Sequence, residues 1–361
     1  MAKLNKSDNS FFESVAALIQ QSRTGVVKYV NNTIVITYYE IGRRIIEREQ
    51  HGENRAQYGK KILQGLSDYL TAKLGKGWSV ENLKLMRRFY SVYSKSRIGQ
   101  PVVTQLEIQK RELPVLQLTS QIGQPIVTHL NPAISWKHYI HLMRITDTNE
   151  RSFYEIEIAK NGWSYSEFER QFNTSLYERL ALSRKKKRIH ELAEKGQIIE
   201  NPQDLLKDPY ILEFTGLPEK AEYTETELEQ KLIDHLQQFL LELGKGFTFV
   251  GRQVRFTYEE ESFFVDLVFF NRLLRCFVLL DLKIGKLKHQ DIGQMQMYVN
   301  FYDRKVKLPD ENPTIGIVLC KDKKDTMVEM MLPEKNKRIF TAKYQTFLPS
   351  KDELRKLLEQ N

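Results

Sequence analysis

The chain has 361 residues, of which 41% are hydrophobic and 28% are charged, and its formal net charge is +9. This length leaves room for two domains with substantial cores, and the composition is that of a soluble globular protein. The two cysteines, Cys276 and Cys320, lie in apolar runs, which excludes a disulfide framework and zinc-binding spacing. No apolar run approaches the length of a membrane span and no secretory signal is recognisable, so we expect a cytoplasmic protein without membrane contact.

Common motifs of enzyme chemistry are absent from the sequence. It contains no GxxxxGK[ST] phosphate loop, no GxGxxG turn after a strand, no HExxH pair and no GxSxG elbow. The seven histidines do not cluster at the spacing of metal ligands. These absences argue against ATP hydrolysis, nicotinamide chemistry, zinc proteolysis and serine hydrolysis.

The first half of the chain is helical in pattern. Apolar residues repeat at helical spacing over residues 11–50 and again over residues 55–73. The motif Gly-Trp-Ser occurs at residues 77–79 and 162–164, and each serine stands where it can cap the following helix. Glycine and proline punctuate residues 95–133, which predicts a long loop with short strand-like pieces. We predict a mostly helical N-terminal domain, residues 1–195.

Two basic segments of this half each have two interpretations. Residues 84–88 include three basic side chains, which could meet phosphates as part of a helix-turn-helix-like unit or form an ordinary solvated helix face. Lys185, Lys186 and Lys187 lie in a run of five basic residues that suits phosphate contact but is also typical of a solvated helix. The net charge of +9 is compatible with an anionic partner.

Prolines at positions 202, 209 and 218 mark a linker, residues 196–222, before a second domain, residues 223–361. Within this domain, apolar periodicity predicts alternating helices and strands. The predicted elements are a helix at 224–244, strands at 247–256, 263–270 and 276–282, a helix at 290–302, a strand at 314–320 and a helix at 353–359.

One acidic residue stands in each of two strands that are otherwise apolar on both faces. Asp266 lies within residues 263–270, and Asp281 lies within residues 276–282. A carboxylate in such a strand is costly to bury unless a positive group compensates it. Lys283 follows Asp281 by two residues, so these two side chains project from the same face of the strand.

The relative position of the two acids depends on the turn between the strands. A turn centred on residues 273–274 would place Asp266 opposite Asp281, although two leucines are poor turn residues. A turn at residues 271–272 fits turn chemistry better, but it would separate the acids by about 13 Å along a flat strand. The sequence leaves both registers open.

Two carboxylates and a lysine on one sheet face suit hydrolysis of phosphodiester bonds. The carboxylates would hold a hard divalent cation, Mg²⁺ or Mn²⁺, which polarises the phosphate and helps to generate hydroxide. The ammonium would stabilise charge in the transition state or orient the attacking water. The alternative is a structural pair in which Asp281 and Lys283 neutralise each other, and the short motif alone gives both interpretations equal weight.

Longer stretches around these residues resemble the YhcG-like family of bacterial proteins, in which a PD-(D/E)xK nuclease domain follows a helical region. They include FFVDLVFF at residues 263–270 and LLDLKIGK at the start of residues 279–303. The resemblance extends, in chain order, over residues 77–90, 162–171, 228–256, 263–270, 279–303 and 313–323. It implies an α+β protein, with a mostly α-helical domain followed by an α/β restriction-endonuclease-like domain of order αβββαβ. Val265 replaces the proline of the motif, and Asp281 replaces the commoner glutamate.

The resemblance also implies roles for polar residues of the second domain. The implied metal ligands are Asp266, Asp281 and Glu229. The implied catalytic set adds Lys283, together with Gln294 and Tyr298, which match the QxxxY extension of some such nucleases. The residues that we expect to contact nucleic acid are Gln253, Arg252, Lys286, Lys288, Lys185, Lys186 and Lys187.

We therefore expect an Mg²⁺-dependent nuclease, an endonuclease acting on DNA, with Mg²⁺ or Mn²⁺ as cofactor and nucleic acid as partner. The helical domain would serve recognition or assembly, which leaves room for a homo-oligomer. Two alternatives stay open: a catalytically inactive nucleic-acid-binding protein that keeps the fold, and an interaction module in which the acids only pair with Lys283. The sequence does not distinguish DNA from RNA, or a nick from a double-strand break.

Overall fold

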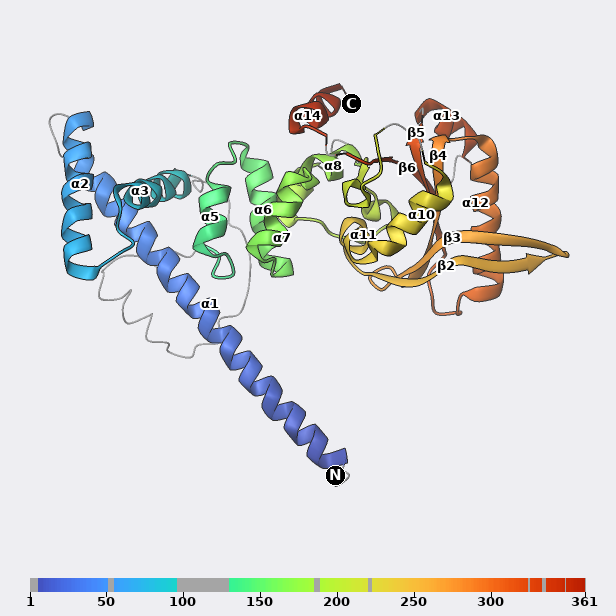
Figure 1. The fold of residues 1–361 in the computed structure, drawn as a ribbon, viewed down its shortest axis with the longest axis horizontal. Helices are drawn as coiled ribbons and strands as arrows, with labels where there is room; N and C mark the ends of the chain where they lie inside the picture. Colours follow the sequence, from blue (N-terminus) through green and yellow to red (C-terminus); the bar gives the residue numbers. More distant parts are fainter. Residues whose placement is uncertain are drawn as a thin grey trace. The chain divides into compact units, whose positions relative to one another are not determined.

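The computed structural model describes residues 6–50, 55–95, 130–184, 189–219, 223–323, 325–332, 336–347 and 349–360. The chain divides into two compact units, Met1–Phe168 and Glu169–Asn361 (Figure 1). The first unit is helical, and the second contains a six-stranded sheet with helices. The expected class, a helical region followed by a mixed α/β domain, is confirmed. No helix in the described ranges is long and apolar enough to cross a membrane.

The helical unit is built around the pairing of its long first helix with a later helix, residues 80–95. Gly42 permits this close approach, because a Cβ there would lie 2.1 Å from the carbonyl oxygen of Met86. The apolar core nearby includes Ile45, Leu63 and Leu83. The described helices are α1 (Lys6–Gln50), α2 (Arg55–Leu74), α3 (Val80–Lys95), α5 (Trp136–Leu142) and α6 (Thr148–Asn161), and α7 (Tyr165–Asn173) crosses the division between the units.

The two Gly-Trp-Ser motifs cap helices, as their spacing predicts. Ser79 Oγ accepts a hydrogen bond from the backbone N–H of Asn82 at 3.3 Å, and Ser164 Oγ accepts one from that of Glu167 at 3.2 Å. Trp78 packs against the apolar core of the helical unit. These contacts satisfy backbone donors at helix starts and support the structural interpretation of the motifs.

The basic side chains of residues 84–88 also have partners inside the helical unit. Arg87 pairs with Glu49 at 2.7 Å, and Arg88 donates to the backbone carbonyl of Met143 at 2.9 Å. Both contacts join α3 to segments distant in the sequence. They favour a structural role for these arginines over the helix-turn-helix-like interpretation.

The sheet unit contains the elements predicted for the second domain and several more. Its strands are β1 (Tyr210–Ile211), β2 (Phe247–Tyr258), β3 (Glu261–Asn271), β4 (Cys276–Lys286), β5 (Ile315–Asp322) and β6 (Ile339–Gln345). Its helices are α8 (Leu176–Leu182), α9 (Ile189–Lys195), η2 (Pro202–Leu205), η3 (Glu213–Thr215), α10 (Glu225–Asp234), α11 (Leu236–Leu243), α12 (His289–Phe301), the π-helical turn η4 (Tyr302–Val306), α13 (Asp325–Met331) and α14 (Lys351–Gln360).

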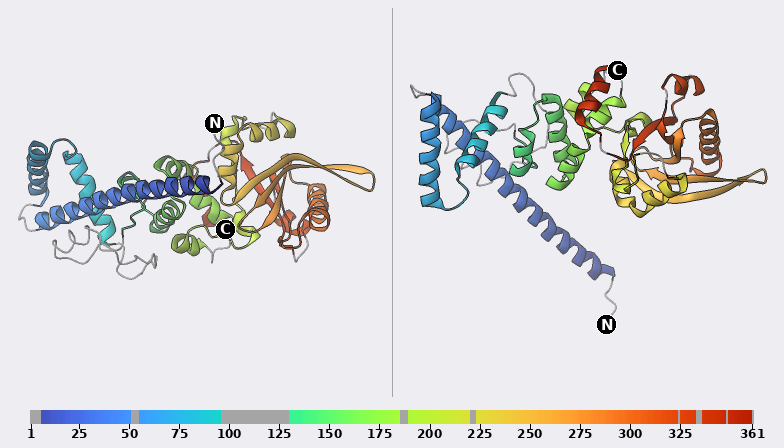
Figure 2. Two further views of the ribbon diagram at one scale, coloured as in Figure 1. Left: turned by 90° about the horizontal axis from the view of Figure 1, so that it is seen from below. Right: turned by 45° about the horizontal axis from the view of Figure 1, so that its top comes forward.

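The strand order of the sheet is β1-β6-β5-β4-β3-β2. Strands β2, β3 and β4 are antiparallel neighbours, and the remaining pairs are parallel. The predicted helix 224–244 forms two helices that meet at His235, while β1 and β6 extend the sheet beyond the predicted strands. Helices α10 and α11 pack on one apolar core of the sheet and α12 packs on the other, so the sheet lies between them (Figures 1 and 2).

The apolar interior accounts for both cysteines. Cys276 and Cys320 are buried free thiols, as their apolar surroundings predict. Burial raises the pKa of each thiol to about 12, so both side chains stay neutral at physiological pH.

The segment before α10 is part of the sheet unit in the structure. Residues 196–222, predicted as a linker, include η2, β1 and η3 among the described positions, and Tyr210 and Ile211 of β1 pair with β6. The prolines end regular elements here, but the short pieces between them still pack. A domain boundary at residue 195 stays a prediction about independent folding.

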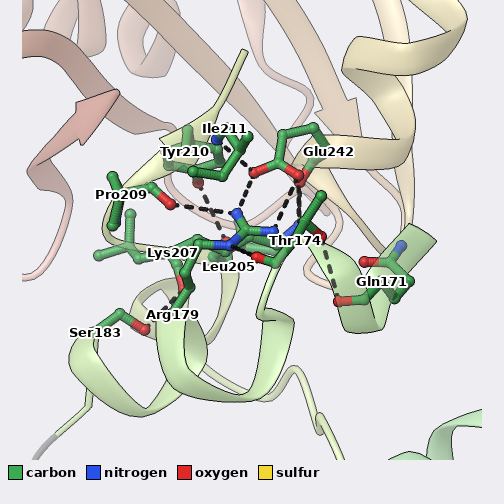
Figure 3. A network of polar contacts seen from close by, with 11 residues as sticks. Gln171, Thr174, Arg179, Ser183, Leu205, Lys207, Pro209, Tyr210, Ile211 and Glu242 are labelled. Atoms are coloured by element: carbon green, nitrogen blue, oxygen red, sulfur yellow. Dashed lines mark hydrogen bonds and ion pairs between the residues drawn. The ribbon is translucent and has the colours of Figure 1, made fainter. Parts of the chain in front are cut away.

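A buried ion cluster holds α8 on the sheet unit (Figure 3). Arg179 of α8 forms an ion pair with Glu242 of α11, and both side chains are essentially inaccessible. Arg179 also donates to the carbonyl oxygen of Thr174 at 2.7 Å, while the backbone N–H of Ile211 donates to Glu242 at 3.0 Å. Lys207 lies 3.9 Å from the same carboxylate. Residues on both sides of the predicted linker therefore share one cluster.

Candidate active site

The β3–β4 hairpin has the register that centres on residues 273–274. Asn271 pairs with Cys276, and the pairing continues without interruption to Leu267 and Leu280. The next position along each strand is an acid, so this register sets the two acids opposite each other. Of the two alternatives that the sequence left open, the structure has the one that brings the acids together.

Asn271 explains why a turn of leucines is tolerated. Its side-chain Oδ1 accepts hydrogen bonds from the backbone N–H groups of Leu273 and Leu274, both at 3.1 Å. Arg275 adopts a left-handed conformation with φ of 50°, which closes the loop. The polar residue thus stabilises the turn from the end of the strand, and a turn at residues 271–272 does not form.

Two carboxylates and an ammonium meet just beyond the last paired residues of β3 and β4, Leu267 and Leu280. Asp266 Oδ2 accepts a hydrogen bond from the backbone N–H of Leu282 at 2.8 Å, which fixes this carboxylate against β4. The buried carboxyl of Asp281 contacts that of Asp266. Lys283 Nζ lies 3.0 Å from Asp281 Oδ2, on the same face of the strand, as the alternation of side chains predicts.

A fourth charged group, Glu225, completes the surroundings of the lysine and was not foreseen from the sequence. Its Oε2 lies 3.4 Å from Lys283 Nζ. Glu225 is the first residue of α10, where an acidic side chain is common because its negative charge interacts favourably with the helix dipole. Residue type and position therefore carried no signal that this glutamate faces β4.

Gln253 joins two carboxylates of the cluster. Its Nε2 donates to Glu229 Oε2 at 2.5 Å and to Asp266 Oδ1 at 3.1 Å. The residue follows an irregularity in β2 and has a φ of 44°, an uncommon conformation for a side chain with a Cβ. We expected Gln253 at the nucleic acid, and the structure sets its amide between two candidate metal ligands.

Glu229 faces this cluster because other residues cap its helix. Thr224 and Glu227 form a reciprocal capping box, in which the Glu227 N–H donates to Thr224 Oγ1 at 3.1 Å. Glu229 is therefore not needed for capping, and its side chain is buried one turn later. Its second oxygen lies 3.4 Å from Arg252 Nε and accepts no hydrogen bond from the described residues.

The surroundings of the acidic cluster disfavour the ionised forms of Asp281 and Glu229. Burial and the nearby Asp266 raise the pKa of Asp281 to about 7, although Lys283 lowers it. Burial likewise raises the pKa of Glu229, against the hydrogen bond from Gln253. Burial alone would lower the pKa of Lys283, but Asp281 and the other acids lift it above its usual range. The ammonium does not fully neutralise the acids, so an additional cation would be favourable here.

The other predicted residues that the structure describes lie outside the acidic cluster itself. Gln294 donates to the hydroxyl of Tyr298 along α12. Burial raises the pKa of Tyr298, and the charges of Asp281 and Asp266 contribute to the rise. Lys286 and Lys288 are exposed and do not join the acidic cluster; Lys288 stands at the N-terminal cap of α12. Residues 185–187 lie outside the described residues.

The donor set fits a hard cation only in part as it stands. No three His, Cys, Asp or Glu side chains of the described ranges are grouped closely enough to hold a metal ion without movement. Asp266 and Asp281 supply two neighbouring carboxylates, and Gln253 draws Glu229 toward Asp266. Carboxylate oxygens with room for water are the ligands that Mg²⁺ and Mn²⁺ prefer, so the chemistry of these residues fits such an ion.

Solved structures with a similar arrangement are remote. A repair endonuclease from Pyrococcus abyssi is 17% identical, with a TM-score of 0.25, over 35% of this chain and 50% of that one. A structure described as an EndoMS–dsDNA complex is 16% identical, with a TM-score of 0.25, over 36% of this chain and 47% of that one. The match thus spans about half the length of each, and at this similarity neither structure defines the chemistry of the site.

Sequence comparison assigns the family. Residues 14–179 match the family described as the DUF1016 N-terminal domain, and residues 203–359 match the YhcG PDDEXK nuclease domain. The chain is 38% identical over 343 residues to the Escherichia coli (strain K12) protein named "Putative nuclease YhcG", covering 95% of this chain and 91% of that protein. The chain therefore belongs to the YhcG family, in which a DUF1016 N-terminal domain precedes a PDDEXK nuclease domain.

Proposed function

We propose that the chain is a nuclease that hydrolyses phosphodiester bonds in DNA and depends on Mg²⁺ or Mn²⁺. One observation carries the proposal: Asp266 and Asp281 meet on adjacent strands, with the Lys283 ammonium 3.0 Å from Asp281. A nuclease domain of the PDDEXK type needs such a set of acids and a lysine at one point of its sheet. The compartment that we propose is the cytoplasm.

Three carboxylates of the site would hold the cation. Asp266 and Asp281 would bind it from the two strands, and Glu229 would approach from α10. When bound, a divalent cation polarises the phosphate and lowers the pKa of a coordinated water. In its absence, the raised pKa of Asp281, about 7, lets this buried carboxyl retain a proton in acid. Cation binding would displace this proton.

Lys283 would act on the reacting phosphate. Its ammonium lies between the strand acid Asp281 and the helix acid Glu225, which restricts its position without burying it fully. From there it would stabilise negative charge on the phosphate in the transition state or orient the attacking water. Gln294 and Tyr298 would limit the movement of the lysine from the side of α12.

Other residues would bind the substrate. Arg252 borders Glu229, and Lys286 and Lys288 are exposed on the segment that leads into α12. The basic run with Lys185, Lys186 and Lys187 is a further proposed contact. Residues 1–195 would serve recognition or assembly, which includes self-association.

One observation favours the second candidate, an inactive protein that binds nucleic acid. Lys283 forms ion pairs with two acids, and among the described residues no ready group of three metal ligands exists. Such an arrangement is also expected of a nuclease-like site that no longer binds a cation. Cleavage of DNA in the presence of a divalent metal distinguishes the two candidates.

The test uses purified full-length protein with plasmid and linear DNA in Mg²⁺, Mn²⁺ or EDTA. We expect cleavage with either metal, none in EDTA, and none from Asp266→Ala. Binding of DNA in EDTA should persist in Asp266→Ala, because the substitution removes a negative charge from the site. Binding without cleavage under every metal condition would favour the inactive candidate.

A further inference from the structure

A groove of about 550 Å³ lies beside the candidate site, between β2 and α12. One contact links the groove to the candidate site. The Phe256 ring, which lines the groove, meets the Tyr298 ring edge-on, with centroids 5.5 Å apart. The charges of Asp266 and Asp281 reach the same tyrosine. Two layers of rings, Phe256 and then Tyr298, therefore separate a molecule in the groove from the acidic cluster.

Aromatic rings and amides line the groove together. The ring of Phe256 stacks on Phe301 with centroids 4.0 Å apart and an interplanar angle of 20°. Tyr258 at the end of β2 keeps 50% of its surface exposed. Gln296 donates to the side chain of Asn300 at 3.1 Å, and both amides line the groove. Aromatic faces with amides are the groups that proteins use to stack and read unpaired bases.

Charged side chains are unevenly distributed along the groove. Arg304 and Lys305 line one part of it from η4, a π-helical turn of the kind that often occurs at functional sites. Both are exposed, and neither forms an ion pair within the described part of the chain. Glu259 and Glu260 stand at the tip of the β2–β3 hairpin, directly after Tyr258, where they would repel phosphate. Figure 1 shows this hairpin extending past α12. Phosphates would align with the cationic part.

Gly293 keeps the groove open from the side of α12. A glycine inside a helix is less stable than alanine at the same position. Packing does not require it here, because a Cβ at Gly293 would meet no described atom within 4 Å. A larger side chain would instead extend into the groove that the glycine lines.

We propose that this groove binds one unpaired nucleotide of the substrate strand. Its base would stack at Tyr258 and bond to the Gln296–Asn300 pair, while its phosphates would face Arg304 and Lys305. This inference rests on the proposed nuclease function and specifies its substrate: nucleic acid with an unpaired nucleotide near the cleaved bond. A fully paired duplex would leave the groove empty.

The binding experiment uses wild-type protein in EDTA with two 2-aminopurine probes, one a paired duplex and one with a single unpaired 2-aminopurine. We expect about tenfold tighter binding of the second probe, because stacking of one base on an aromatic ring contributes about five- to 150-fold. Its fluorescence should fall as the base stacks. Equal affinities with unchanged fluorescence would overturn the proposal.

Gly293→Phe tests the groove directly by filling it. We expect the tenfold preference to disappear while affinity for the paired duplex is unchanged. Gly65→Phe is the matched control, because Gly65 is also an exposed helical glycine with no described atom within 4 Å of a Cβ. A preference that survives in a folded Gly293→Phe protein would overturn the proposal.

If that variant does not fold, the double variant Arg304→Gln with Lys305→Gln tests the groove instead. It should reduce the preference for the unpaired probe and the salt dependence of that preference, and no reduction would be contrary evidence.

Cleavage separates this proposal from the one on which it rests. If wild-type protein cuts DNA with Mg²⁺ but binds and cuts paired and unpaired probes alike, the groove proposal fails and the nuclease remains. If no metal supports cleavage but the preference and its loss in Gly293→Phe persist, the nuclease fails and the groove remains.

Discussion

Two buried clusters of charge in the sheet unit are compensated in opposite ways. Burial alone would raise the pKa of Glu242, but Arg179 and Lys207 outweigh it and this pKa lies below its usual range. In the candidate site, burial raises the pKa of Asp281, and Lys283 does not outweigh it. One cluster has enough positive charge and hydrogen bonds for its acid, and the other does not.

The difference distinguishes a charge cluster that stabilises the fold from one that is suited to bind a ligand. A buried carboxylate with complete partners stabilises one arrangement and leaves little capacity for another ligand. Adjacent carboxylates that retain a proton can exchange it for a cation when one is available. The same unit therefore contains a cluster that holds elements together and a cluster suited to bind a metal ion.

The largest expected effect is on cleavage. Lys283→Ala should lower the single-turnover rate on the order of a thousandfold, because the ammonium acts on the transition state. DNA affinity in EDTA should remain within about twofold, since one cation contributes little to the electrostatic total. Rates from quenched reactions and affinities from fluorescence anisotropy test both parts. A variant that cuts normally would place the lysine outside the chemistry.

The next effect is on the stability of the structural cluster. Arg179→Met should lower the free energy of unfolding by about 3–5 kcal/mol, because Glu242 would remain buried without its closest cation, beside Lys207 at 3.9 Å and the Ile211 N–H. Arg275→Met is the control, since its pair with Asp310 is exposed and contributes at most about 1 kcal/mol. Urea unfolding measures both variants. Equal losses would contradict the contrast between buried and exposed pairs.

The third prediction concerns pH. The folded-state pKa of Asp281, about 7, exceeds that of an unfolded aspartate, so its stabilising contribution is present in acid and is lost as pH rises through 7. Metal-free wild-type protein should lose about 1–4 kcal/mol between pH 5 and pH 8 relative to Asp281→Asn. Saturating Mg²⁺ should reduce this difference. Urea titrations at each pH in EDTA test it, and parallel profiles for the two proteins would be contrary.

The smallest effect is expected at Gln253. Gln253→Gly removes the amide that joins Glu229 to Asp266 while accommodating the positive φ. We expect Mn²⁺ affinity to fall about tenfold, as for other residues that orient metal ligands, with stability nearly unchanged. Calorimetric titration of Mn²⁺ measures the first quantity and thermal unfolding the second. Unchanged affinity would show that the amide does not position the acids.

Much of the sheet unit could be predicted from local pattern. Apolar runs predicted β2 to β5, and the two acids in otherwise apolar strands were noticeable because such positions rarely carry charge. The hairpin register was one of two alternatives, since the choice depended on the side chain of Asn271 bonding to the turn. Glu225 was not assigned to the cluster, because its position does not differ from an ordinary helix start, and Gln253 was assigned to the nucleic acid because a polar strand residue does not reveal which group its side chain meets.

By itself, the sequence determined the types of the longer helices and of strands β2 to β5, the burial of both cysteines, and the presence of Asp281 and Lys283 on one face of a strand, because these follow from periodicity along a single segment. The tertiary structure decided that Glu225 meets Lys283, 58 residues away, and that Arg179 meets Glu242, 63 residues away. Such contacts depend on how helices pack against the sheet. No local periodicity encodes that packing, so only the folded chain shows which charges compensate one another.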